Sequence, residues 1–188
     1  MATSHRRLNA PTRGHFSGRL FEPGLARCII GSYAILWAGS ILFALVALPF
    51  AGHLRDAFGY RLAPAPSGTA SIAAPIAANN MREAAIPLLF AVLKIRGQRR
   101  LVTVGDVVVG ASLAVNVALG GLALGSYGVG LLHFLPQWPL EWGGLALALA
   151  GWRRARRGRR DPCELALLAL AAAILLCLAA LIETYAVP

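Results

Sequence analysis

Hydrophobic residues gather along this chain into long stretches that short polar segments separate. The stretches cover residues 28–50, 75–95, 101–125, 127–152 and 163–186. A helix needs about 20 mostly apolar residues to cross the ~30 Å hydrocarbon core of a bilayer, and each stretch reaches that length. The pattern therefore predicts an all-α fold, a polytopic transmembrane helix bundle with about five spans.

The fourth stretch, 127–152, contains two prolines that should interrupt it. After Pro139 only about 20 Å of helix remains before Trp152, which is too short to cross the bilayer. We therefore expect residues 127–135 to form a re-entrant or interfacial segment. A short helix should follow a break in the chain. The residues of the expected break are Pro136, Gln137, Trp138 and Pro139. The alternative is one long helix kinked at its prolines.

The remaining connection on that side, residues 51–74, contains Pro64, Pro66, Ser67 and Gly68. Clustered prolines, serines and glycines favour irregular structure. An irregular loop is therefore the expectation for this segment.

Composition agrees with a membrane protein, because 57% of the residues are hydrophobic, 14% are charged and the mean hydropathy is +0.64. The net charge of +10 raises the question of nucleic acid. All but Arg55, Arg61 and Arg82 of the 18 basic residues lie in the first 27 residues or in the 94–100 and 153–160 connections. Such clustering between apolar runs is typical of cytoplasmic loops and not of a nucleic-acid surface.

The same clustering predicts the orientation. Basic loops stay in the cytoplasm. Residues 1–27 are then a cytoplasmic basic tail, and residues 28–188 form a transmembrane domain of a multi-pass cell-membrane protein. With five crossings, the C-terminus lies outside.

Several polar side chains fall inside the predicted spans, where an unpaired polar group is costly. Counting 1.5 Å per residue from the helix ends places them in the outer half of the bilayer or at its outer surface. They are Asn79, Asn80, Arg82, Glu83, Asn116, Glu141 and Glu183. One interpretation is a polar site in which Arg82 pairs with Glu141 or Glu183 and Asn116 faces the bundle interior. The other is a set of structural hydrogen bonds and ion pairs that hold the bundle together.

Other features predict structural roles. Asp106 lies near the inner edge of its span and should pair with an arginine. Gly121 and Gly125 have the GxxxG spacing that lets two helices pack closely. We interpret it first as packing within the bundle and second as a dimer contact. The cysteines and histidines are scattered, so we expect no metal site and no cofactor. No catalytic motif is present, so no catalytic residue is assigned and an enzyme is not expected.

Four short pieces of the chain carry a resemblance. They are Asn79-Asn80, Asn116 with the glycines after it, residues 135–141 with Ala150-Gly151, and the ending 179–188. In these pieces, within residues 75–188, the chain resembles the stage II sporulation protein M family of membrane proteins. Gln137 stands where that family usually has a histidine.

The resemblance implies a multi-helix scaffold without known catalysis, which recruits other membrane or cell-envelope proteins. The alternative is a small permease-like or substrate-binding subunit of a transporter, because a broken helix beside intramembrane polar groups is typical of transport sites. Such a small chain would act as a homo-oligomer or with a separate ATPase. The expected partners are therefore the lipid bilayer and other proteins, and not nucleic acid.

Overall fold

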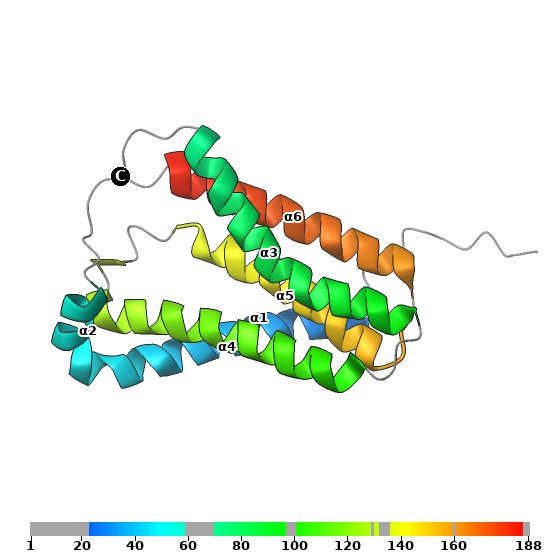
Figure 1. Ribbon diagram of the computed structural model, residues 1–188, viewed down its shortest axis with the longest axis horizontal. Coiled ribbons are helices and arrows are strands. Elements are labelled where there is room, and N and C mark those ends of the chain that lie inside the picture. The colour runs from blue at the N-terminus through cyan, green and yellow to red at the C-terminus, as the bar shows by residue number, and fades with distance from the viewer. Residues whose placement is uncertain are drawn as a thin grey trace, which may run out of the picture.

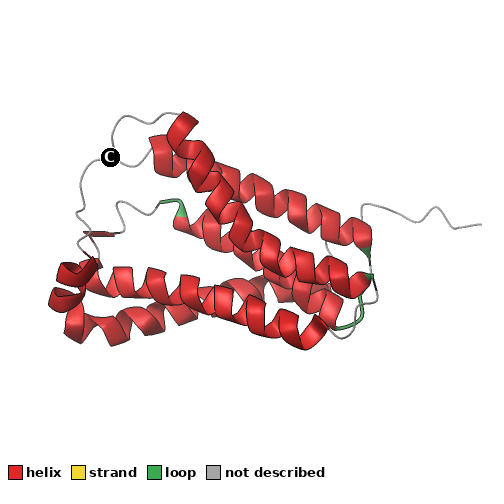
Figure 2. Cartoon of the chain, in the orientation of Figure 1, coloured by secondary structure: helices red, strands yellow, loops and turns green. Residues whose placement is uncertain are grey.

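The computed structural model describes residues 23–58, 70–96, 101–128, 130–131, 136–159 and 161–185, and the account below is confined to them. They form helices, with short turns at the ends of some of them (Figure 2). The elements are α1 (Pro23–Ala47), η1 (Leu48–Phe50), α2 (Ala51–Phe58), α3 (Ala70–Ile95), α4 (Leu101–Tyr127), α5 (Trp138–Arg156) and α6 (Pro162–Tyr185). The predicted all-α helical bundle is confirmed.

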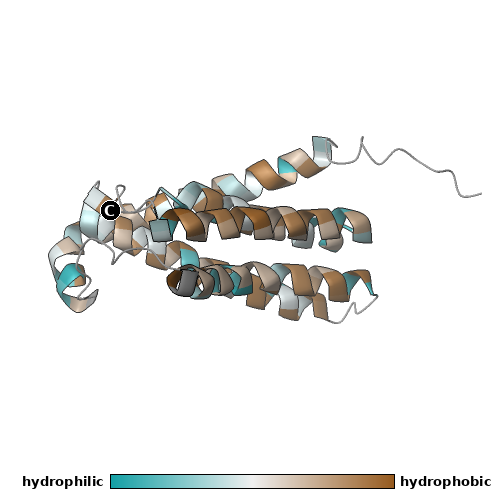
Figure 3. Cartoon of the chain, turned by 90° about the horizontal axis from the view of Figure 1, so that it is seen from above, coloured by the Kyte–Doolittle hydropathy of each residue, from teal (hydrophilic) through white to brown (hydrophobic). Residues whose placement is uncertain are grey.

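Four helical segments are long and apolar enough to cross a membrane: Pro23–Ala57, Ile72–Ile95, Leu101–Tyr127 and Pro162–Tyr185. Large apolar side chains such as Ile30, Leu42, Val107 and Leu170 point away from the bundle. Hydrophobic residues also dominate the middle of these helices (Figure 3). Exposed apolar surface of this extent is unfavourable in water and favourable in lipid, so the protein is a membrane protein.

The remaining long helix, α5, differs from the other four. It has 19 residues and lies at the centre of the bundle, between the α1–α4 pair and the α3–α6 pair (Figure 1). Its alanines at 146, 148 and 150 are fully buried, which lets the surrounding helices approach closely. The sequence predicted about five spans, with a short helix after the break in the fourth. It did not predict that this short helix, α5, is a core helix that its neighbours cover.

The chain is not one kinked helix from 127 to 152. α4 ends at Tyr127, Pro136 and Gln137 form a turn, and α5 begins at Trp138. The predicted break is therefore confirmed at Pro136 and Gln137. Trp138 and Pro139 belong to the helix instead, because a proline in the first turn gives up an N–H that has no helical partner. Of the expected re-entrant segment 127–135, residues 129 and 132–135 lie outside the described residues.

The predicted irregular loop at residues 51–74 is wrong at both ends. Residues 51–58 form α2, whose Leu54 is half-buried where α2 packs against α4. α3 begins at Ala70, five residues before Pro75, which is inside the helix. The Pro, Ser and Gly cluster that motivated the prediction lies in residues 59–69, outside the described part of the chain. In the same way, residues 23–27 of the predicted tail are helical, and residues 1–22 are not described.

The arginines at the end of α5 join this helix to three others. Arg154 Nη2 donates to Glu164 Oε2 of α6 at 2.7 Å, and Arg156 Nη2 lies 3.1 Å from Asp106 Oδ2 of α4. Arg153 Nη1 donates to Ser32 Oγ of α1 at 3.2 Å. The predicted pairing of Asp106 with an arginine is confirmed. The segment expected to be a loop, 153–160, is thus helical as far as Arg156.

A tight turn follows α5. Gly158 has φ +83°, the left-handed conformation that ends many helices. Its N–H donates to Ala155 O, and Arg159 N–H donates to Arg154 O, the bond pattern of a Schellman cap. Asp161 Oδ1 then accepts the N–H groups of Cys163 and Glu164, which caps α6.

Gly121 and Gly125 of α4 pack against α1. A Cβ on Gly121 would lie 2.5 Å from Ser40 O, and one on Gly125 would overlap Ala44 O. Only glycine permits this separation of the two backbones, so the predicted role in internal packing is confirmed.

Candidate functional site

Polar side chains from three helices meet where α5 begins. Asn80 and Glu83 lie three residues apart on one face of α3, and Ser112 and Asn116 lie four apart on one face of α4. Glu141 is in the first turn of α5, where the partial positive charge of the helix N-terminus favours a carboxylate.

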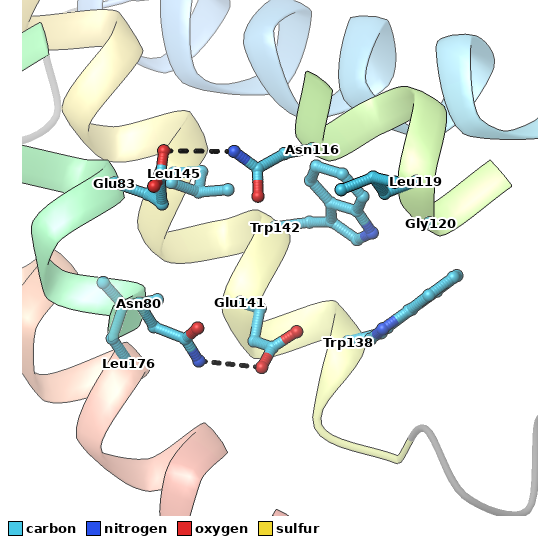
Figure 4. Close-up of a pocket in the computed structure, with 10 residues that line it drawn as sticks. All are labelled: Asn80, Glu83, Asn116, Leu119, Gly120, Trp138, Glu141, Trp142, Leu145 and Leu176. Carbon is cyan, nitrogen blue, oxygen red and sulfur yellow. Dashed lines mark hydrogen bonds between the residues drawn. The ribbon is translucent and has the colours of Figure 1, made fainter. Parts of the chain in front are cut away.

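Hydrogen bonds pair these groups across the helices (Figure 4). Asn80 Nδ2 donates to Glu141 Oε1 at 2.9 Å, which joins α3 to α5. Ser112 Oγ donates to Glu83 Oε2 at 2.6 Å, and Asn116 Nδ2 donates to the same oxygen at 3.1 Å. Both carboxylates therefore accept hydrogen bonds from neutral donors on another helix.

The hydrogen-bonded groups surround a cavity of about 200 Å³ that reaches α6 at Leu176. A second pocket of about 430 Å³ adjoins it and shares Asn80, Trp138 and Glu141. Asn79 and Glu183 line the second pocket, together with the buried Gln137 of the helix break. We refer to the first as the polar cavity and to the second as the outer pocket.

The structure thus brings six of the seven predicted polar residues to two adjoining pockets. Depth counting on separate helices was sufficient for this, because helices that pack side by side place residues of equal depth next to one another. The six are Asn79, Asn80, Glu83, Asn116, Glu141 and Glu183.

Arg82 is the exception, and the expected pairing with Glu141 or Glu183 is wrong. Its Nη2 lies 3.3 Å from Glu83 Oε1, and its side chain is 73% exposed. The expectation assumed that residues adjacent on a helix cannot meet. Arg82 and Glu83 start from different faces of α3. Glu83 points toward α4, and the arginine side chain is long enough to reach it.

Tryptophans form one wall of the polar cavity. Trp138 was predicted only as part of the helix break, and Trp142 and Trp37 were not predicted as site residues. Trp138 and Trp142 line it, with ring centroids 6.3 Å apart in an edge-to-face arrangement. Trp37 of α1 packs against both rings from behind, at 6.2 and 6.5 Å. Their spacing was a usable signal, because residues 138 and 142 are four apart and must share a face of any helix that begins at the break.

Ser112 was also missed. It precedes Asn116 by four residues and so lies on the same face of α4. Gly120, one turn beyond Asn116, faces the two tryptophans: a Cβ there would lie 3.5 Å from Trp138 Cη2 and 3.6 Å from Trp142 Cζ2. Those are ordinary contact distances, so the cavity has room at this position.

Among the described residues, no group of three or more His, Cys, Asp and Glu side chains is arranged to hold a metal ion. Glu141 and Glu183 line the same pocket, but the three glutamates of the two pockets do not form such a group. Comparison of the chain with protein-family models, with curated proteins and with solved structures finds no match.

Proposed function

We propose that this protein is the substrate-binding or permease-like subunit of a membrane transport assembly, with the polar cavity as its solute site. The observation that carries the proposal is the placement of hydrogen-bonded carboxylates and amides around a cavity where α5 begins after a non-helical turn. Solute sites of transporters are commonly built at such helix interruptions within the membrane. A purely structural network would not need a cavity beside it.

The orientation we propose has the basic end of the bundle in the cytoplasm. Arg153, Arg154 and Arg156 of α5 contact the early turns of α1, α6 and α4, so the basic helix ends gather on one side. Cytoplasmic loops are enriched in arginine and lysine. In this orientation α2 and the polar cavity lie toward the outside, and the membrane is the cell membrane.

We also propose a relationship to the stage II sporulation protein M family. The four sequence pieces that resemble the family are far apart along the chain. Asn80, Asn116, Glu141 and Glu183, one from each piece, line the two adjoining pockets. The support for the relationship is the four pieces themselves, which occur in order along the chain.

A scaffold that recruits envelope proteins is the second candidate. The observation that favours it is α2, a short helix beyond the apolar part of α1 whose His53, Arg55 and Asp56 are exposed. An exposed polar helix of this kind offers a partner a surface outside the lipid.

Purification of the tagged protein from native membranes in mild detergent should separate the two candidates. If the cavity is a transport site, a chain this small should co-purify with an ATPase or further membrane subunits. Replacing His53, Arg55 and Asp56 together with alanine should leave that association intact. Recovery of cell-wall hydrolases alone, lost in the triple α2 variant, would instead establish the scaffold role.

A further inference from the structure

The chemistry of the two pockets restricts what they can bind. Glu83, Glu141 and Glu183 contribute carboxylates to the walls, and no lysine, arginine or histidine is among the described residues that line either pocket. Arg82 points away from the cavity and is 73% exposed. The chain has a net charge of +10, whereas the ionisable groups of the pocket walls are all acidic. Carboxylates within a membrane bundle are costly unless a cation or donors compensate them.

The hydrogen-bonding groups point the same way. Asn80 and Asn116 each use Nδ2 to donate to a carboxylate, so the oxygens of these amides face the site as acceptors (Figure 4). Carboxylates are also acceptors only, when ionised. A ligand that donates hydrogen bonds and carries positive charge therefore matches the walls, and an anion does not.

The tryptophan wall supplies a second, independent feature. The indole rings of Trp138 and Trp142 border the cavity beside Glu141 of the same helix and across from Glu83, and the face of a tryptophan ring attracts cations. Trp142 is only 5% exposed, and its Nε1 has no hydrogen-bond acceptor among the described residues. The edge of the ring next to this nitrogen faces Gly120, another residue of the cavity wall. This nitrogen is itself closed off in the structure, and a ligand oxygen that reached it by a small shift of the ring would accept the unused hydrogen bond.

The size of the cavity and the arrangement of its carboxylates favour an organic cation over a metal ion. The described carboxylates do not converge to hold a metal ion. The cavity volume of about 200 Å³ is below the ~300–1,000 Å³ of sites for drug-sized molecules, so the ligand has few heavy atoms. We infer that the polar cavity binds a small organic ammonium ion that also carries an oxygen acceptor, with the nitrogen between the Glu141 carboxylate and the tryptophan wall. This inference rests on the proposed solute site and names its ligand class.

Three probes of nearly equal size test the charge requirement: ethanolammonium chloride, ethylene glycol and sodium glycolate, which are cationic, neutral and anionic. The purified full-length protein in detergent is titrated with each at constant ionic strength, and tryptophan fluorescence and Tm are recorded. Ethanolammonium should give a saturable fluorescence change and a higher Tm. The other two should give neither at the same concentrations. A saturable response to magnesium chloride that displaces ethanolammonium would overturn the inference in favour of a metal site.

Variants of the cavity wall locate the binding. Glu141→Gln keeps the shape of the side chain and should weaken ethanolammonium binding at least tenfold. Gly120→Ala adds one methyl group at a position with room for it and should weaken binding several-fold. Gly110→Ala, on the same helix but with open space around it, is the matched control and should bind as the parent does.

The outcomes separate the ligand class from the function. Equal binding of ethylene glycol or glycolate, weakened by Gly120→Ala, would overturn the ammonium inference while the solute site stands. Unchanged ethanolammonium binding in both Glu141→Gln and Gly120→Ala would overturn it as well. The absence of a response to all three probes would also overturn the inference. The proposed transport role would then depend on the co-purification experiment alone.

Discussion

Replacing Gly121 or Gly125 with alanine is expected to destabilise the bundle strongly. The added Cβ would overlap main-chain oxygens of α1, Ser40 O in one case and Ala44 O in the other. A backbone atom cannot move aside as the end of a side chain can, so α1 and α4 must separate along their length. Overpacking of this kind costs about 1–3 kcal/mol per substitution. The measurement is thermal or denaturant unfolding of the purified protein in detergent.

Gly110→Ala is the control on the same helix, because no atom lies near the position of its Cβ. Alanine also has the higher helix propensity, so the control should unfold at the parent Tm or slightly above it. If all three variants unfold at the same temperature, the close packing of α1 on α4 is wrong.

Arg154→Ala should cost even more. Arg154 and Glu164 form a two-point ion pair, Nε to Oε1 at 2.6 Å and Nη2 to Oε2 at 2.7 Å, with side chains only 7% and 12% exposed. Removing one partner leaves the other charge buried without compensation, which costs about 3–5 kcal/mol. We expect little folded protein to be recovered, measured as the monodisperse fraction after size-exclusion chromatography.

Two comparisons isolate the cause. Replacing both Arg154 and Glu164 with leucine should recover much of the stability, because no buried charge is then left alone. Arg82→Ala removes an arginine that is also paired with a glutamate, but Glu83 keeps its hydrogen bonds from Ser112 and Asn116, so we expect a smaller loss than for Arg154→Ala. Equal losses for Arg82→Ala and Arg154→Ala would contradict the burial that distinguishes them.

The sequence predicted the spans well, because a run of about 20 apolar residues has few alternatives to a membrane helix. It was less informative about α5. That this helix is short could be read from the sequence, because too little chain follows Pro139 to cross the bilayer, but its place in the bundle could not. Its central position depends on the small side chains of Gly144 and Ala148, against which neighbouring helices pack. Which helix lies at the centre is a property of all the helices together and cannot be read from one of them.

The polar cavity was partly predictable for a related reason. Depth along a helix follows from residue counting, so Asn80, Asn116 and Glu141 could be placed at one level. Rotation about the helix axis, which decides the partners, follows from packing. For that reason the level was right, while the partner chosen for Arg82 was wrong. Trp142 was missed because the sequence alone does not distinguish a tryptophan that lines a cavity from one that anchors a helix at the membrane surface.

The central claim is that a solute-accessible cavity lies inside this bundle and faces the outside of the cell. Cysteine scanning with a membrane-impermeant thiol reagent tests it directly, in a background with Cys28, Cys163 and Cys177 replaced. Gly120→Cys places a thiol in the polar cavity. Gly110→Cys places one on the side of the same helix that points away from the bundle, toward lipid. Added to intact cells, the reagent should modify residue 120 and leave residue 110 unmodified, because a thiol in lipid does not ionise. An unreactive residue 120, or equal labelling of both positions, would contradict the account.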